Sequence, residues 1–99
     1  MVLEVSCGSG INFNFIPENC TIFGLDLSFG MLQAASYRKN AGVLCHGLAE
    51  KLPFIDHAFD TVFHIGGINF FNDKAEALKE MVRVAKPGTK IIIKDETPK

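Results

Sequence analysis

Short apolar runs recur along the chain and are separated by amphipathic or irregular connections. Runs rich in β-branched and aromatic side chains are typical of strands. The pattern predicts five strands, at Val2–Val5, Thr21–Leu25, Val43–His46, Phe59–Ile65 and Lys90–Lys94. The last strand is centred on three successive isoleucines, Ile91 to Ile93, which predicts that other elements cover both of its faces.

The segment after the second strand predicts a helix. Ser28 is a suitable N-cap, and the helix is expected to run to about Asn40 before Gly42 stops it. Its buried stripe is expected to consist of Met31, Leu32 and Ala35.

A second helix is predicted after the fourth strand. Asp73 and Glu76 have the spacing of a capping box, and the helix ends before Pro87-Gly88. The residues expected on its buried face are Leu78, Met81, Val82 and Ala85.

The other two connections are irregular. Ile11 to Pro17 supports at most a short, irregular helix, because its asparagines and proline weaken helical structure. Gly47 to His57 contains Pro53 and no periodic pattern, so we expect a loop with one helical turn at Ala49 to Lys51. Strands that alternate with such connections predict an α/β protein with a parallel sheet and right-handed crossovers.

Length and composition predict one domain over residues 1–99. The net charge is −1 without a basic run, so nucleic acid is not an expected partner. No apolar run approaches the roughly 18 residues that a membrane span needs, and no signal-peptide pattern is seen. The three cysteines are far apart in the sequence and are expected to be reduced thiols of a cytoplasmic protein, without a disulfide or zinc site.

A glycine-rich loop follows the first strand and indicates a nucleotide site. The stretch Glu4-Val-Ser-Cys-Gly8-Ser-Gly10 lets backbone approach a ligand, and Asp26, which closes the second strand, can accept hydrogen bonds from ribose hydroxyls. Ligands of parallel sheets bind beyond the carboxyl ends of the strands. Segments Ser6–Gly10, Gly47–Glu50 and His64–Gly67 should therefore meet Asp26 at one edge.

Two common nucleotide motifs do not match. A dinucleotide-binding loop has a third glycine, and Phe13 stands at that position, so the sequence argues against NAD as the ligand. A P-loop is excluded because the chain contains no Gly-Lys-Ser/Thr sequence.

The glycine loop resembles motif I of the class I S-adenosylmethionine-dependent methyltransferases. Further matches follow in the family's order, and the nearest group is the ubiquinone/menaquinone-biosynthesis-like (type 11) methyltransferases. These matches are Phe23-Gly-Leu-Asp26-Leu-Ser28, Gly47-Leu-Ala-Glu50-Lys-Leu-Pro53-Phe54, Phe59-Asp60-Thr-Val and Glu80-Met-Val-Arg83-Val-Ala-Lys86-Pro87-Gly88. The resemblance implies a Rossmann-like three-layer sandwich with strand order 3-2-1-4-5.

The resemblance also implies that S-adenosyl-L-methionine is the cofactor and S-adenosyl-L-homocysteine the product. Gly8 and Gly10 would admit the methionine part of the cofactor, Glu4 would hold its ammonium group, and Asp26 would bind the ribose. The other residues implied at the cofactor are Ser6, Cys7, Leu27, Met31, Leu48, Ala49, Glu50, His64, Ile65 and Gly66.

The chain departs from the family pattern at two site positions. Ser6 occupies the first glycine position of motif I, and Leu48 stands where the family usually has an aspartate that hydrogen-bonds the adenine amine. Both changes are expected to weaken cofactor affinity.

The chain also lacks the family's helices before the first strand and its final antiparallel strand pair. We therefore expect a minimal core that is a fragment, a truncated reading frame or a protein completed by a partner. The fifth strand would be an exposed edge available to a second copy or to a partner chain.

Several assignments stay open. The chain is expected either to methylate an unidentified small-molecule acceptor or to bind the cofactor without turnover. His64 is a general-base candidate, although a packed histidine is the favoured interpretation, and Asn69, Phe70 and Phe71 are candidates for substrate contact. Residues expected to be structural or solvated, without a metal site, are Cys7, His46, Glu50, His57 and Asp60.

Overall fold

The computed structural model describes residues 1–38, 40–66 and 71–94. In chain order the elements are β1 (Val2–Val5), the 3-10 helix η1 (Ile11–Phe15), β2 (Ile22–Asp26), α1 (Phe29–Ala35), β3 (Val43–His46), β4 (Thr61–Ile65), α2 (Lys74–Val84) and β5 (Ile91–Lys94). The predicted irregular helix after β1 is therefore confirmed as η1.

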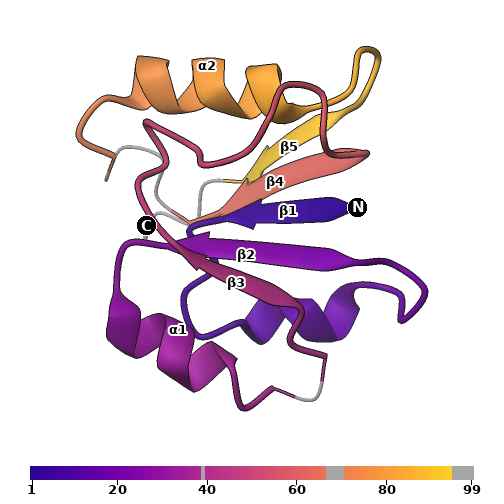
Figure 1. Cartoon of the computed structure of the whole chain (residues 1–99), viewed down its shortest axis with the longest axis vertical. Coiled ribbons are helices and arrows are strands. Elements are labelled where there is room, and N and C mark those ends of the chain that lie inside the picture. Colours follow the sequence, from indigo (N-terminus) through magenta and orange to yellow (C-terminus); the bar gives the residue numbers. More distant parts are fainter. Residues whose placement is uncertain (39, 67–70, 95–99) are drawn as a thin grey trace.

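The strands form one sheet in the order β3-β2-β1-β4-β5, and every pair is parallel. In Figure 1, α2 covers one face of the sheet, whereas η1 and α1 lie against the other face. This arrangement confirms the predicted Rossmann-like three-layer sandwich and its strand order.

Two apolar clusters fill the layers. On the α2 side, Leu3 and Val5 of β1 pack with Val62 of β4 and Met81 of α2, and all four side chains are buried. On the other side, Phe13 of η1 fills the space between the sheet and α1. Alternate residues of the parallel strands thus face opposite layers, so the central strand β1 is buried on both faces.

Helix α1 is shorter than predicted. Ser28 caps it as expected, because its Oγ accepts a hydrogen bond from the backbone nitrogen of Met31 at 3.2 Å. The helix ends at Ala35 instead of near Asn40, since the amides of Tyr37 and Arg38 donate to carbonyls three residues earlier. Leu32 and Ala35 are buried as predicted, but the prediction for Met31 is wrong, because its side chain is 48% exposed.

The buried face of α2 is also shifted from the prediction. Met81 is buried, but Val82 is 62% exposed, and Ala85 lies beyond the helix end although it is buried. The residues of α2 that face the sheet are Ala77, Met81 and Val84.

Strand β5 is an edge strand with exposed isoleucines. Ile92 and Ile93 are exposed, so the prediction that both faces of this strand are covered is wrong for the residues described. Among the described residues β5 pairs with β4 alone, so the expectation that the fifth strand lies at an edge of the sheet is confirmed. Within the described residues, the structure has no helix with both the length and the apolar character needed to cross a bilayer.

Candidate functional site

The glycine-rich loop is joined to the end of β2. After β1 the backbone passes through left-handed conformations at Ser6 (φ 59°), Gly8 (φ 57°) and Gly10 (φ 79°). The Cys7 amide donates to the carbonyl of Leu25 at 2.9 Å, and the Gly8 amide donates to Asp26 Oδ2 at 2.8 Å. These bonds bring the carboxyl ends of β1 and β2 together, as the sequence pattern predicts.

Asp26 faces the loop with acceptor capacity to spare. Its Oδ2 accepts from Gly8, and its Oδ1 accepts from the backbone nitrogen of Ser28 at 2.9 Å. An ionised carboxylate offers about four lone-pair positions, so each oxygen can accept a further hydrogen bond. The side chain is only partly buried, which leaves those positions accessible to ribose hydroxyls.

The two glycines of the loop have different surroundings. A Cβ atom at Gly8 would meet nothing within 4 Å, so the backbone there borders open space. A Cβ at Gly10 would lie 2.8 Å from the Phe13 ring and 3.2 Å from Cβ of Ala35. Gly8 is therefore placed for close ligand approach, whereas Gly10 lets η1 and α1 pack beneath the loop.

A small pocket of about 140 Å³ lies at this edge of the sheet. It contains five of the predicted cofactor residues, namely Ser6, Leu27, Leu48, Ala49 and Glu50. Gly47 and Phe71, both singled out by the sequence pattern, also line it, together with Asn72, which was not among the predicted residues. Asn72 precedes the N-cap of α2, and the beginning of a crossover helix at the carboxyl edge was the signal that could have identified it.

Glu4 lies buried beneath the loop, on the face of the sheet that η1 covers. Its Oε2 accepts a hydrogen bond from Asn12 Nδ2 at 2.9 Å, and its Oε1 has no partner among the described residues. Burial raises the pKa of Glu4 to about 7, with a smaller contribution in the same direction from Asp26 and an opposing one from the Asn12 hydrogen bond. Glu4 thus holds a carboxylate oxygen that a cationic ligand group could satisfy.

His64 is buried at the carboxyl end of β4. Its Nδ1 lies 2.9 Å from the carbonyl oxygen of Val5. Because a carbonyl only accepts, Nδ1 donates a hydrogen to it, and the neutral tautomer with this geometry has its lone pair on Nε2. Nε2 has no partner in the part of the chain that the structure describes. The centroid of the Phe71 ring lies 4.8 Å from the centroid of the imidazole. His64 is therefore buried, as the favoured interpretation expected, and among the described residues one of its two ring nitrogens has a hydrogen-bond partner.

The other predicted residues lie around the pocket without lining it. Cys7 packs into the cluster around Phe13 as a buried filler, as expected, and burial raises its pKa to about 12, with Glu4 and Asp26 adding to the shift. Met31 lies on the exposed side of α1. Ile65 and Gly66 are partly buried at the end of β4, and the expectations for Asn69 and Phe70 lie outside the described residues.

The residues that were expected to be exposed or structural lie away from the pocket or at the protein surface in most cases. His46 and His57 are exposed, and Asp60 sits at the other end of β4, where it pairs with the Met1 amine and with Lys86. Glu50 is a partly buried loop residue whose Oε2 accepts a hydrogen bond from the Asp73 amide at 3.2 Å. Among the described residues, no group of three or more His, Cys, Asp or Glu side chains is arranged to hold a metal ion.

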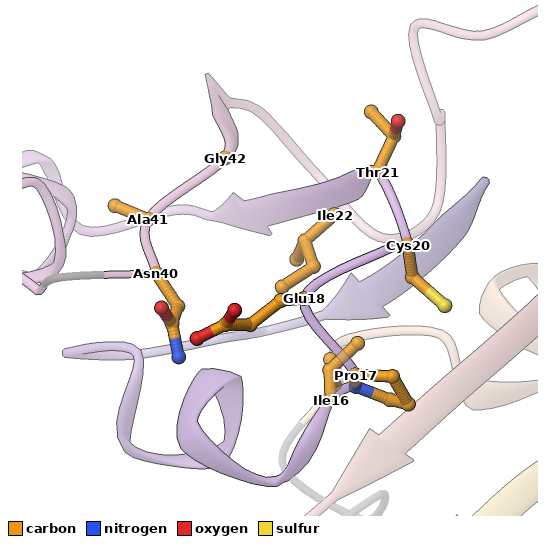
Figure 2. Close-up of a pocket in the computed structure, with 9 residues that line it drawn as sticks. All are labelled: Ile16, Pro17, Glu18, Cys20, Thr21, Ile22, Asn40, Ala41 and Gly42. Atoms are coloured by element: carbon orange, nitrogen blue, oxygen red, sulfur yellow. The ribbon is translucent and has the colours of Figure 1, made fainter.

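A larger hollow of about 310 Å³ lies at the opposite edge of the sheet, before the starts of β2 and β3. Figure 2 shows the Glu18 carboxylate and the Asn40 side chain pointing into the same space. The hollow contains none of the predicted cofactor residues, since parallel strands place all of those at their carboxyl ends.

A parallel 3-2-1-4-5 sheet with a glycine loop and an acidic residue at adjacent strand ends defines a Rossmann-like nucleotide-binding domain of the methyltransferase type. The comparisons with known proteins agree. The chain belongs to the family whose model is described as "Methyltransferase domain" (type 11), which matches residues 3–93. The resemblance stated from the sequence is therefore confirmed.

The chain is similar to demethylmenaquinone methyltransferase of Renibacterium salmoninarum, with 36% identity over 93 residues that cover 93% of this chain and 39% of the relative. A SAM-dependent methyltransferase structure from Thermotoga maritima is 29% identical, with a TM-score of 0.80 and coverage of 93% and 42%. A methyltransferase in complex with the Trm112 activator of Haloferax volcanii is 27% identical, with a TM-score of 0.81 and coverage of 91% and 42%. The chain thus spans less than half the length of these proteins.

Membership of this family implies S-adenosylmethionine as the cofactor, and the residues fit it. Asp26 retains free acceptor positions, Gly8 borders open space, and a buried oxygen of Glu4 has no partner within the described part of the chain. Leu27, Leu48 and Ala49 give the pocket apolar walls of the kind that contact an adenine ring.

Proposed function

We propose that this chain is the cofactor-binding core of an S-adenosylmethionine-dependent methyltransferase that acts on a small acceptor. The observation that carries the proposal is the junction of Gly8 with Asp26 next to a pocket walled by Leu27, Leu48 and Ala49. Five sequence-predicted residues line one pocket at the edge where parallel sheets bind ligands.

Each side chain has a proposed role in holding the cofactor. Asp26 accepts hydrogen bonds from the ribose hydroxyls, and Leu27, Leu48 and Ala49 contact the adenine. Glu4 takes the ammonium group, for which its unpartnered Oε1 is available. Ser6, Gly8 and Glu50 border the ligand, and Ile65 and Gly66 face its sulfonium side.

The cofactor, when bound, supplies a methyl group that is already activated by its sulfonium charge. The protein's contribution is alignment, because displacement requires the acceptor in line with that methyl group. His64 Nε2 is a candidate proton acceptor, since it has no partner among the described residues and its ring is held by Val5 and Phe71.

The acceptor class is proposed from the relatives. Similarity to demethylmenaquinone methyltransferases supports a small quinone-type acceptor for the whole protein. The balanced charge and the reduced cysteines support a cytoplasmic location without a nucleic-acid or membrane partner.

The exposed β5 edge is proposed as a contact for a second copy or a partner chain. Ile92 and Ile93 are exposed, and no other described strand pairs with the outer edge of β5, which is a template for added strands. The Haloferax methyltransferase is seen with an activator protein, so a partner has a precedent among the structural relatives. Light scattering at rising concentration tests self-association, and strictly monomeric behaviour would exclude it.

Calorimetric titration with S-adenosylhomocysteine tests the cofactor assignment. We expect binding, and we expect S-adenosylhomocysteine to bind more tightly than NAD, because Phe13 replaces the third glycine of a dinucleotide loop. Folded protein that gives no binding heat at high micromolar ligand would refute the proposal.

The second candidate function is cofactor binding without turnover. It is favoured by one observation, the pocket volume of about 140 Å³, which is below the roughly 300–1,000 Å³ of complete ligand sites. Incubation with methyl-labelled S-adenosylmethionine and demethylmenaquinone analogues separates the two functions. Label in the acceptor supports the enzyme, and binding without transfer supports the binding module.

A further inference from the structure

The pocket wall at Gly47–Glu50 belongs to an irregular connection between β3 and β4. Such a segment has no strand or helix of its own to fix its position. Helix α2 and its N-cap hold this segment in place. The N-cap residue Asp73 contacts Glu50, and residues near the end of the helix contact Leu52 and Phe54.

The main anchor is Arg83, in the last turn of α2. A guanidinium has five N–H donors, and Arg83 uses all of them. Two go to carbonyls of the connection, with Nη2 at 3.0 Å from the oxygen of Leu52 and Nη1 at 2.8 Å from that of Phe54. Nη1 also donates to Asp56 Oδ1 at 2.8 Å, while Nε and Nη2 donate to Glu80 at 2.6 and 3.0 Å.

Glu80 completes this anchor. Its Oε1 accepts from the Leu52 amide at 2.8 Å, so the helix holds Leu52 by both its amide and its carbonyl. The hydrogen bonds between Arg83 and Glu80 raise the pKa of the guanidinium and lower that of the carboxyl, so both groups stay charged. The Leu52 side chain is buried, which fixes this residue from the other side as well.

The second anchor lies at the start of α2. The Asp73 carboxylate accepts from the Glu76 amide at 3.1 Å, as a capping box requires. The Asp73 amide, however, donates to Glu50 of the pocket wall instead of completing the box with Glu76. Residues 50–56 are thus held between the two ends of one helix.

We infer that Arg83 is a positioning residue for the ligand, because it fixes the segment whose first residues form the pocket wall. This inference rests on the proposed function. Arg83 does not line the pocket and acts only through the connection at Leu52 and Phe54. Its replacement should therefore loosen the wall and weaken cofactor binding without removing any ligand contact.

The test compares Arg83→Met with Lys86→Met. Lys86 is the control for the loss of a cation that forms an ion pair, because its Nζ contacts Asp60 at the far edge of the sheet, whereas Arg83 pairs with Asp56 and Glu80. S-adenosylhomocysteine affinity is measured by calorimetry, and amide hydrogen exchange is followed at residues 48–52. We expect about tenfold weaker binding and faster exchange for Arg83→Met, and less than twofold weaker binding for Lys86→Met.

A third variant, Arg83→Lys, separates positioning from folding. Lysine keeps the charge but cannot donate to Leu52, Phe54 and Glu80 together, so we expect an affinity between those of wild type and Arg83→Met. If Arg83→Met does not fold, a folded Arg83→Lys with at least threefold weaker binding supports the inference.

Unchanged affinity in folded Arg83→Met, or in Arg83→Lys where it alone folds, would overturn the inference. Wild-type protein that does not bind S-adenosylhomocysteine refutes the proposed function instead. In that case the exchange data still decide whether Arg83 fixes the connection.

Discussion

The Gly8 amide lies 2.8 Å from Asp26 Oδ2, so the carboxylate proposed to bind ribose also holds the glycine-rich loop in place. The other oxygen of Asp26 accepts from the Ser28 amide, at the start of α1. One side chain therefore organises three elements of the site: the loop after β1, the end of β2 and the N-terminus of α1. Its replacement should affect both the ligand and the fold.

We expect Asp26→Ala to weaken S-adenosylhomocysteine binding about tenfold or more, because it removes charge-assisted hydrogen bonds. Two backbone amides also lose their acceptor, which should lower the free energy of unfolding by about 1–3 kcal/mol. Calorimetry and urea denaturation measure the two effects. The control is Glu18→Ala, a carboxylate at the opposite edge of the sheet (Figure 2), and equal affinities for the two variants would contradict the assignment.

We expect Ser6→Gly to stabilise the protein. Ser6 has a φ of 59°, which costs a residue with a Cβ roughly 1–2 kcal/mol, whereas glycine adopts this conformation freely. Part of the gain is offset by the flexibility of glycine in the unfolded chain, so the net increase should be about 1 kcal/mol. Urea midpoints measure it. Ser9→Gly is the control, because the φ of Ser9 is not positive and the same change there should be neutral or destabilising.

The pKa of Glu4 predicts a pH dependence of stability. The folded-state pKa of about 7 lies above the ordinary glutamate value of 4.5, so the folded protein binds this proton more tightly. The resulting stability is fully present below pH 4.5 and is lost as the pH rises to about 7, at up to about 1.4 kcal/mol per pH unit.

Glu4→Gln isolates this contribution. Glutamine can still accept from Asn12 but does not titrate in this range. The stability difference between wild type and variant should therefore change with pH between about 5 and 7, while contributions from the histidines cancel. Denaturation curves of both proteins with parallel pH profiles would show that Glu4 does not titrate in this window.

We expect Leu48→Asp to tighten cofactor binding. Leu48 lines the pocket and is 43% exposed, so the fold should tolerate a carboxylate there. A hydrogen bond from the adenine amine to a charged acceptor is worth about 1.5–3 kcal/mol, which is roughly a tenfold gain or more. Titration of Leu48→Asp and of Leu48→Ala with S-adenosylhomocysteine tests this, and a gain for alanine alone would indicate that the leucine only obstructs the ligand.

The strands and their order were predictable because apolar runs and family motifs agree along most of the chain. The helix faces were less predictable. In α2, the predicted stripe consisted of Leu78, Met81, Val82 and Ala85, whereas the buried residues of the helix are Ala77, Met81 and Val84, with similar helical spacing. Leu78 and Ala85 also lie against this core, so Val82 is the residue that the prediction places on the wrong face. Only the position of the sheet decides between the two stripes.

In the candidate site, too, some features were predictable from the sequence and others were not. The glycine loop and Asp26 have sequence signatures, so their meeting could be foreseen. The contacts of Arg83 with the carbonyls of Leu52 and Phe54 could not, because an irregular connection has no periodic pattern that shows which backbone groups it presents. Likewise, the edge position of β5 followed from the expected strand order, but three successive isoleucines do not show that its faces stay exposed.

The central strand of the sheet is also the first in the sequence, and it pairs with β2 on one side and with β4 on the other. Val2 pairs with residue 22 of β2 on one side and with residue 61 of β4 on the other. During synthesis, β1 can therefore pair with β2 well before the residues of β4 have been made. Such distant pairings slow folding and leave a nascent apolar strand half covered. Chaperone dependence during translation should accordingly be greatest while the segment between β2 and β4 is being made.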